Sequence, residues 1–268
     1  MGQGEQGDEK GASERLDTTL VKGLRILECL AEASEPLGVS ALSDILGIGR
    51  SNMHRLLKTL AATGYVAQEP RTRRYLATLK LWEQGSVIAE RSRLRRAAHP
   101  VLRNLNAETG EVVFLSILHG SDILYVDKID PVVRFSTAAR SGLRVPAVYT
   151  ASGKALLAHQ PNCAELVNES LTRLNSFDAN QRADLLKEME TIAEEGCAYS
   201  FSGWTAHAQS VAVVVPNADF PPVAAIGTVV CTDATAVRSG ARRGCGTHRQ
   251  SDVIAVHPIR PQITASLV

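Results

Sequence analysis

Long apolar runs, clustered cysteines and a large net charge are all missing from this 268-residue sequence. No apolar stretch approaches the roughly 18 residues that a membrane helix requires, so we expect a soluble, cytoplasmic protein. The first 15 residues, MGQGEQGDEKGASER, have no apolar core, and we expect neither a secretory signal nor a transit peptide. The five cysteines never form a CxxC motif, which argues against a disulfide framework and a zinc site.

Charge is unevenly distributed along the chain, although its net value is only +1. With 44% hydrophobic residues, the chain should fold rather than stay disordered throughout. Residues 18–96 carry a net charge of +6, whereas the rest of the chain carries −5. Such a division is typical of a cationic module for a polyanionic partner joined to a more acidic domain.

The cationic segment has the pattern of a helix-turn-helix. It follows residues 1–17, which have no apolar period and which we expect to be a disordered tail. Apolar residues at helical spacing predict three short helices, over about 18–35, 41–46 and 51–62. Ser40 is a candidate N-cap for the second helix, and the glycines of the turn at 47–49 join the second helix to the third.

A hairpin is predicted directly after the third helix. Short strands at 65–67 and 74–76 lie on either side of a basic turn at 68–73. A hairpin in this position is called a wing. Residues 18–78 are therefore predicted to be a winged helix-turn-helix domain.

The third helix and the wing contain the candidate DNA-binding residues. Between Gly49 and Leu76 there are six basic residues and a single acidic one, Glu69. Because the apolar residues of the helix share one face, its polar side chains must point outward, and such a helix fits the major groove of DNA. A solvated basic face is the alternative, but the helix, the glycine turn and the wing together favour double-stranded DNA. The candidates are Arg50, Ser51, Asn52, His54, Arg55 and Lys58 on the helix and Arg71, Arg73 and Arg74 on the wing.

The rest of the chain predicts a second domain of another kind. Residues 79–108 are predicted to form a long helical stretch that Pro100 should break or kink and Gly110 should end. Its first part, residues 79–98, is the predicted linker helix between the two domains. Strands are then predicted at 112–118, 123–129, 132–138, 210–215 and 223–230, with helices at about 152–159, 163–170 and 179–195. The predicted fold class is α+β, with an N-terminal winged helix-turn-helix and a mostly antiparallel sheet in residues 99–236. Residues 237–268 show no helical period and are treated as an atypical C-terminal tail.

The step Gly153-Lys154 is not a phosphate-binding loop, because the upstream glycine and the Ser or Thr after the lysine are both missing. Thr150 or Ser152 can instead cap a helix. The first backbone N–H groups of that helix, on Ala151, Ser152 and Gly153, would form a small anion site. An ordinary capped core helix explains the same residues equally well.

The motifs resemble those of the isocitrate lyase regulator (IclR) family of bacterial transcription factors. The segment GRSNMHRLLKTLAATGYV is similar to the recognition helix of that family, and RSGLRVPAVYTASGKALLA is similar to its effector-domain signature. VAVVVPNADFPPVAAIGTVV resembles the paired terminal strands of the same domain. The resemblance covers about residues 18–230. It implies a GAF-like effector-binding domain, a homodimer or homotetramer, and operator binding that a small organic acid controls.

The resemblance also implies an effector site. The amides of Ala151 and Ser152 would hold the effector carboxylate, with Ser210 and the neighbourhood of Ser202 contributing from the opposing segment. Gly227 and Val229 stand where a relative carries hydroxyl groups, which argues against a very small, highly polar effector. No cofactor and no metal are expected.

Two other functions compete with ligand-responsive regulation. A hydrolase or transferase could use Ser152, Lys154, His207 or Cys163 on a carboxylic substrate, but the sequence contains no nucleophile elbow, HExxH motif or Rossmann fingerprint. We therefore expect a protein that is not an enzyme. A small-molecule-binding module without DNA contact is the other alternative, and the basic face of the third helix argues against it.

Overall fold

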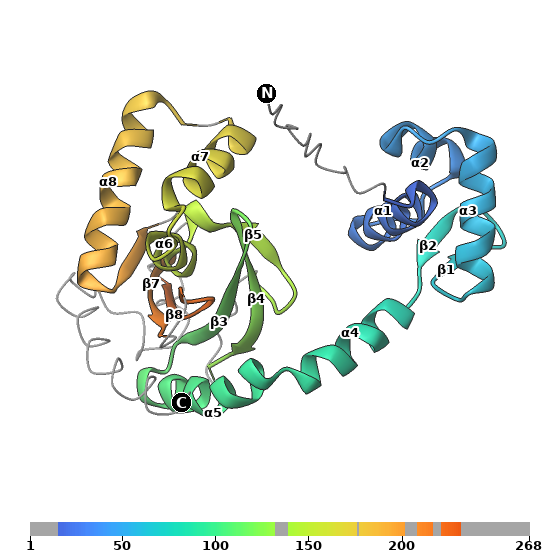
Figure 1. Cartoon of the computed structure of the whole chain (residues 1–268). Coiled ribbons are helices and arrows are strands. Elements are labelled where there is room, and N and C mark those ends of the chain that lie inside the picture. The colour runs from blue at the N-terminus through green and yellow to red at the C-terminus, as the bar shows by residue number, and fades with distance from the viewer. Residues whose placement is uncertain (1–15, 132–138, 176, 202–207, 217–220, 232–268) are drawn as a thin grey trace, which may run out of the picture. The chain divides into compact units, whose positions relative to one another are not determined.

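The computed structural model describes residues 16–131, 139–175, 177–201, 208–216 and 221–231. The chain divides into two compact units, Met1–Ile88 and Ala89–Val268 (Figure 1). Residues 1–15 of the predicted tail, the predicted strand at 132–138 and the C-terminal residues 237–268 lie outside the described residues. Among the described helices, none is both long and apolar enough to cross a lipid bilayer.

The N-terminal unit combines three helices with a short hairpin. Its elements are α1 (Thr18–Glu32), α2 (Val39–Leu46), α3 (Arg50–Ala62), β1 (Val66–Gln68) and β2 (Tyr75–Ala77). The two strands pair antiparallel, with Ala67 opposite Leu76. The elements share one apolar cluster, which includes the fully buried side chains of Ile26, Leu42, Met53 and Leu57. The predicted winged helix-turn-helix is confirmed.

Helix ends in this unit follow local chemistry, with one departure from the prediction. The Asp17 carboxylate begins α1 by accepting hydrogen bonds from the N–H groups two and three residues further on, at 2.8 and 3.0 Å. The prediction that Ser40 caps the second helix is wrong, because α2 begins at Val39 and its N-cap residue is Gly38. Val39 packs against the apolar cluster, so burial extends the helix by two residues. Gly47 ends α2 at a φ of +65°, a left-handed conformation that suits glycine.

The second unit is built on a six-stranded antiparallel sheet with the order β5-β4-β3-β8-β7-β6. The strands are β3 (Val112–His119), β4 (Asp122–Ile129), β5 (Arg144–Pro146), β6 (Ala198–Phe201), β7 (Ala208–Val215) and β8 (Ala224–Cys231). The helices are α5 (Arg93–Thr109), the short 3-10 helix η1 (Ala147–Tyr149), α6 (Ala151–Ala158), α7 (Cys163–Leu174) and α8 (Ala179–Glu195), and α4 (Lys80–Arg91) spans the boundary between the units. The α+β fold class predicted from the sequence is confirmed.

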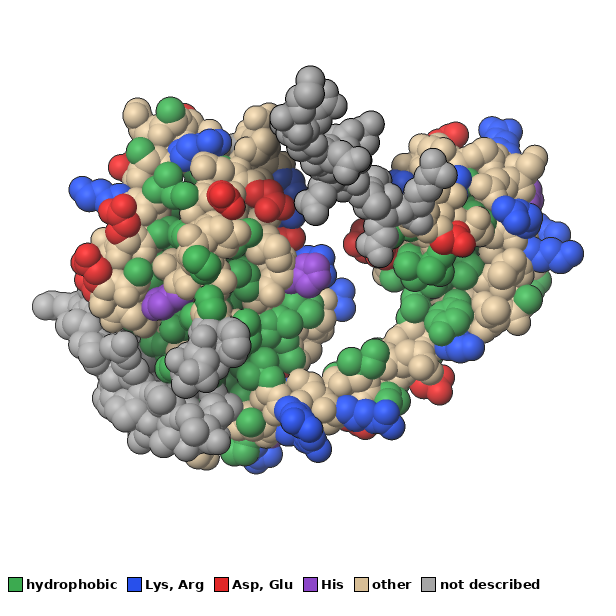
Figure 2. Space-filling view, viewed as in Figure 1, with side chains coloured by type: hydrophobic (Ala, Val, Ile, Leu, Met, Phe, Trp, Pro, Cys, Tyr) green, Lys and Arg blue, Asp and Glu red, His purple; other side chains and the backbone are tan. Residues whose placement is uncertain are grey.

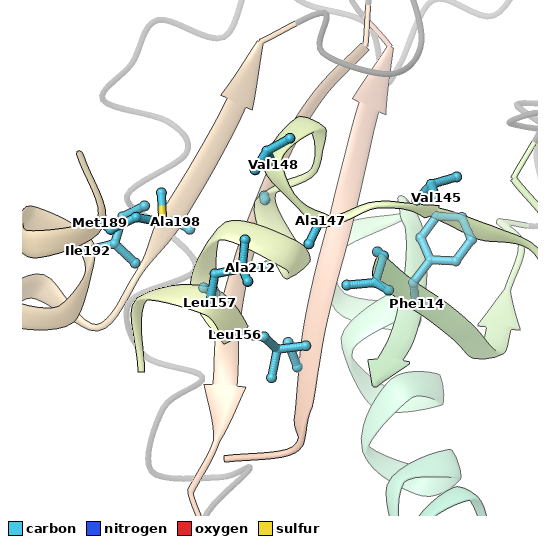
Figure 3. Close-up of a cluster of buried hydrophobic side chains, with 14 of the residues drawn as sticks. Phe114, Val145, Ala147, Val148, Leu156, Leu157, Met189, Ile192, Ala198 and Ala212 are labelled. Carbon is cyan, nitrogen blue, oxygen red and sulfur yellow. The ribbon is translucent and has the colours of Figure 1, made fainter. Parts of the chain in front are cut away.

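Each face of the sheet has its own apolar cluster. On one face, Leu102 and Leu105 of α5 pack with inward residues of β3 and β8, such as Leu115 and Ile226. On the other face, α6 lies over the strands, and η1, α7 and α8 complete a second cluster. Figure 3 shows Leu157 of α6 close to the strand that carries Ala212, in this second cluster. Helix α6 is therefore packed between the sheet and the neighbouring helices along its whole length.

The long helical stretch is interrupted at a different residue from the one predicted. The break lies at Ser92, whose hydroxyl accepts a hydrogen bond from the Arg95 N–H at 3.2 Å and so begins α5. Pro100 lies inside α5, and the prediction of a break there is wrong. A proline removes one backbone hydrogen bond, but the buried face of α5 packs along the sheet and compensates for that loss. Gly110 ends α5 at a φ of +70°, as predicted.

Strands β5 and β6 were not predicted. They are only three and four residues long, so a two-residue alternation barely develops in them. Pairing with other strands defines both: Val145 lies opposite Ile123, and Ala198 lies opposite Ala212. These strands form at the edges of a sheet whose centre the sequence did predict.

Candidate nucleic-acid interface and effector site

Helix α3 has one buried face and one cationic face. Met53, Leu56 and Leu57 are buried in the apolar cluster of the N-terminal unit. The helix contains no acidic residue, so all of its formal charge is positive. Figure 2 shows Lys and Arg side chains gathered where Figure 1 places α3. The predicted DNA-binding residues of the helix all reach solvent, Asn52 being half-buried and the others exposed: Arg50, Ser51, His54, Arg55 and Lys58.

The wing adds three exposed arginines, Arg71, Arg73 and Arg74. Its turn is closed by hydrogen bonds from the Arg73 N–H to the Glu69 carbonyl and from the Glu69 N–H to the Arg74 carbonyl, at 2.9 and 2.8 Å. The Glu69 carboxylate accepts a hydrogen bond from the Thr72 hydroxyl rather than pairing with an arginine. Arg73 has a φ of +60°, which costs about 1 kcal/mol or more for a residue with a Cβ. The tip of the wing therefore holds an arginine in a strained conformation.

Within residues 16–88, none of the cations on α3 or the wing forms an ion pair. Lys80 is in a different situation. Its ammonium lies 4.6 Å from the centre of the Tyr65 ring and donates a hydrogen bond to the Thr63 carbonyl at 2.8 Å. Lys80 thus stabilises the end of α3, whereas the predicted DNA-binding cations remain free to meet an external anion.

The second candidate site lies at the start of α6. Thr150 is its N-cap, as predicted, and the hydroxyl oxygen accepts a hydrogen bond from the Gly153 N–H at 3.0 Å. The predicted set of three free amides is therefore wrong for Gly153. The amides of Ala151 and Ser152 have no hydrogen-bond partner among the described residues, and both residues are buried.

Close packing explains the glycine before Lys154. A Cβ at Gly153 would lie 2.1 Å from the Ala147 carbonyl oxygen, so only glycine fits there. Gly227 of β8 has a similar role, because a Cβ there would lie 2.8 Å from the Ser152 Oγ and 3.1 Å from the Ala212 Cβ. The two glycines together let the first turn of α6 press against η1 and the sheet.

Ser210 shares a sheet face with the start of α6. It precedes Ala212 on β7 by two residues, so the two side chains lie on the same face, roughly 7 Å apart along the strand. Its neighbour across the strand pair, Ser200, donates a hydrogen bond to the Tyr149 carbonyl at 2.9 Å. Ser202 lies outside the described residues.

Among the residues considered for catalysis, Ser152 is buried and Lys154 is held in an ion pair. The Lys154 ammonium lies 2.8 and 2.9 Å from the two carboxylate oxygens of Glu188 on α8. Burial raises the pKa of the Cys163 thiol, which disfavours the reactive thiolate. His207 lies outside the described residues. No cluster of three or more metal-ligating side chains occurs in the part of the chain that the structure describes.

A buried carboxylate on the α5 face of the sheet was not among the predicted site residues. Asp127 of β4 is buried, with its two oxygens 3.2 Å from the Arg95 Nη2 and 2.9 Å from the His99 Nδ1. Arg95 and His99 are one helical turn apart on α5, so both side chains reach the same carboxylate. The spacing of four residues between Arg95 and His99 indicates that both can contact one carboxylate. It does not reveal which acidic residue supplies that carboxylate.

A β-bulge points Asp127 toward α5. Leu115 pairs with Asp127, whereas the next residue of β3, Ser116, pairs with Tyr125. Val126 is therefore an extra residue, and the normal alternation of faces is shifted after it. Without the bulge, Asp127 would lie on the same face as Tyr125, inside the apolar cluster under α6.

Comparison with known proteins accounts for both units. Residues 19–70 match the IclR helix-turn-helix domain, and residues 87–240 match the family described as bacterial transcriptional regulator IclR C-terminal. The chain is 33% identical to the HTH-type transcriptional regulator KdgR of Dickeya chrysanthemi over 67% of this chain and 59% of that protein. It is 29% identical to the HTH-type transcriptional regulator XynR of Escherichia coli over 79% of this chain and 85% of that protein.

Solved structures agree on the fold. An IclR homologue from Microbacterium hydrocarbonoxydans, complexed with 4-hydroxybenzoate, superposes with a TM-score of 0.68 at 19% identity, covering 93% of this chain and 99% of that one. The larger of the two family matches alone spans more than half of the sequence. The chain therefore belongs to the IclR family of bacterial transcriptional regulators, as its motifs predicted.

Proposed function

We propose that this protein is a cytoplasmic, DNA-binding transcriptional regulator whose operator binding is controlled by a small organic acid, and that it acts without catalysis. The observation that carries the proposal is the set of exposed, unpaired cations on α3 and the wing. Duplex DNA is the polyanion that fits a helix of this diameter beside a basic hairpin. Family membership supports the same function.

The proposed interface has two parts. The outward side chains of α3 enter the major groove, led by Arg50, Asn52 and Arg55 in its first two turns, because recognition helices contact base edges through their N-terminal residues. Arg71, Arg73 and Arg74 contact phosphates or the minor groove, which positions the domain without reading sequence. We expect Lys58, further along α3, to contact a phosphate.

A salt titration with duplex DNA tests the interface. Binding of the full chain should weaken steeply as salt rises, because each phosphate contact releases counterions. Arg55→Ala and Arg74→Ala should each reduce both the affinity and the salt dependence. Arg103→Ala removes a matched exposed charge from α5 and should change neither. Absent or salt-independent binding would contradict the proposal.

The proposed effector site uses the amides of Ala151 and Ser152, with Ser210 and the neighbourhood of Ser202 opposite them. Two partnerless N–H groups at a helix start suit a carboxylate. The 4-hydroxybenzoate bound to the Microbacterium homologue is an acid of this class and a suitable first probe. An effector can shift DNA binding only by as much as its affinity differs between the two conformations of the regulator.

A thermal-shift screen with matched ligands tests the effector site. An acid at 100 times its dissociation constant should add about 2.7 kcal/mol to the free energy of unfolding. The primary amide of the same acid should add much less, because it brings no negative charge to the amides. Equal shifts for acid and amide would contradict a carboxylate site at α6.

We also propose a homodimer or homotetramer. Large apolar side chains are exposed on α1 and along α4, among them Leu20, Leu24, Trp82 and Ile88, at 63%, 51%, 72% and 71% exposure. Figure 2 shows hydrophobic side chains at the surface of both helices. Sedimentation of the wild type should give a mass above that of one chain, and Trp82→Ala or Leu24→Ala should lower it if these faces are shared between copies.

A further inference from the structure

On the exposed face of α3, one hydrogen bond joins two of the proposed DNA-binding side chains. The Arg55 Nη2 donates to the Asn52 Oδ1 at 3.0 Å. The two residues are three apart, so they are neighbours on the helix surface. Asn52 is half-buried while Arg55 is exposed, and the bond holds the guanidinium beside the amide before any DNA is bound.

This bond determines what Asn52 can offer to a base. An asparagine that reads adenine uses both halves of its amide, donating to N7 and accepting from the N6 amino group. Here the Oδ1 already accepts from Arg55, so one of its two lone pairs is used, whereas both N–H donors of the amide remain available. The pairing with adenine must therefore share the Oδ1 with Arg55, whereas donation from the amide to a base acceptor needs no such sharing.

Arg55 also presents donors only. A guanidinium has five N–H groups, and a single one is used in the bond to Asn52. The exposed cations on the same face, Arg50 and Lys58, add further donors, and α3 has no carboxylate to accept from the amino group of cytosine. Guanine is the base that shows two acceptors, O6 and N7, side by side in the major groove.

We infer that Asn52 and Arg55 act as one unit that selects guanine in the operator. Arg55 donates to O6 and N7 of the guanine, while Asn52 holds the guanidinium in place and donates to an acceptor on the neighbouring base. The inference rests on the proposed function, since it assigns a base preference to an interface that must first bind DNA.

Selection of binding sites from a randomised duplex pool tests the inference. The full-length protein should recover sites with guanine at one fixed position in each half-site. Replacing that G·C pair by A·T should weaken binding of the wild type to the selected site by roughly 5- to 150-fold. Binding to random duplex serves as the common reference for both sites. Replacing the guanine by 7-deazaguanine, which lacks the N7 acceptor, should give part of the same loss.

Two variants separate reading from charge. Arg55→Lys keeps the charge but replaces the rigid planar fork by a single flexible ammonium, so the ratio of affinities for the guanine and adenine sites should fall. Asn52→Ala releases the guanidinium and should lower the same ratio to an intermediate value. Lys58→Ala should weaken both sites by a similar factor and leave the ratio unchanged, as expected for a phosphate contact.

The outcomes are distinguishable. A selected site with adenine at the position that responds to Arg55→Lys would overturn the inference, as would an Arg55→Lys variant that keeps the full guanine preference. In either case, salt-dependent DNA binding would leave the proposed function standing. Failure of the wild type to bind any duplex in the pool would overturn the proposed function itself.

Discussion

The two units of the chain use their charged side chains in opposite ways. The ion pairs found among the described residues all lie in the second unit and join different elements or neighbouring residues, as in Asp127 with Arg95 and His99, and Lys154 with Glu188. On α3 and the wing of the first unit, the cations are exposed and unpaired. Charge in the second unit therefore contributes to assembling the fold, whereas charge in the first is available to a partner.

The difference has a physical cause. A buried carboxylate such as Asp127 must be paired, because desolvation of an unpaired charge costs several kcal/mol. Exposed arginines remain hydrated and contribute little to folding, but several of one sign create a field that attracts a polyanion. Substitutions in the second unit should thus change stability, and substitutions on the α3 and wing surface should change binding.

The same substitution should have opposite effects in the two units. Gly153→Ala places a Cβ 2.1 Å from the Ala147 carbonyl oxygen and should destabilise the second unit by about 3 kcal/mol or more. Gly85→Ala adds a Cβ in open space on α4 and should be neutral or stabilise by up to about 1 kcal/mol. Urea denaturation of both variants measures the difference. A mild effect of Gly153→Ala would contradict the close approach of α6 to η1.

Removing both partners of Asp127 should be the next most damaging change. The double variant Arg95→Ala/His99→Ala leaves a buried carboxylate with only the Lys128 N–H, 3.1 Å from Oδ1, as a donor. Breaking a buried pair typically costs 3 to 5 kcal/mol, and because Arg95 and His99 are themselves partly exposed we expect about 2 to 3 kcal/mol.

Adding Asp127→Asn to that double variant supplies the control. The neutral amide has a smaller desolvation penalty, so the triple variant should be more stable than the double variant in urea. Equal stabilities would show that the charge of Asp127 is not what Arg95 and His99 compensate.

Alkaline pH should destabilise the second unit through Tyr125. Burial raises the pKa of Tyr125 from 10 to about 12, so the folded state keeps a proton that the unfolded chain loses. The contribution is fully present below pH 10 and is lost as the pH rises toward 12, by about 2 to 3 kcal/mol at most. Denaturant melts between pH 9 and 12 measure the slope.

Tyr125→Phe should reduce this alkaline loss without abolishing it. The pKa of Tyr199 is also raised to about 12, mainly by burial and to a smaller extent by a hydrogen bond with Cys197. Tyr199 remains in the variant and keeps its own contribution. An unchanged pH slope in Tyr125→Phe would contradict the contribution of Tyr125.

The wing should show the smallest effect on stability, and of the opposite sign. Arg73→Gly relieves a positive φ and should stabilise by about 0.5 to 1 kcal/mol, while it weakens DNA binding through the lost cation. Arg74→Ala should weaken DNA binding without the gain in stability. Thermal melts compare the stabilities of the two variants, and DNA titrations compare their affinities. A loss of stability in Arg73→Gly would show that the arginine side chain supports the wing.

Local patterns predicted the elements that later position both candidate sites. The apolar spacing of Met53, Leu56 and Leu57 was sufficient to assign the buried face of α3, because a helical period depends only on neighbours in sequence. The cap at Thr150 was predictable for the same reason. The predicted break at Pro100 and the predicted cap at Ser40 are wrong, because packing of α5 and of Val39 outweighed the local preference.

Composition and periodicity were enough to establish a basic winged helix-turn-helix joined to an antiparallel α+β domain, because each of these features depends on residues that are close together in the sequence. They could not show which charges are paired, that a bulge at Val126 turns Asp127 toward α5, or that Gly153 and Gly227 are required by close contact. Those features depend on residues that are distant in sequence and meet only when the sheet and its helices are assembled.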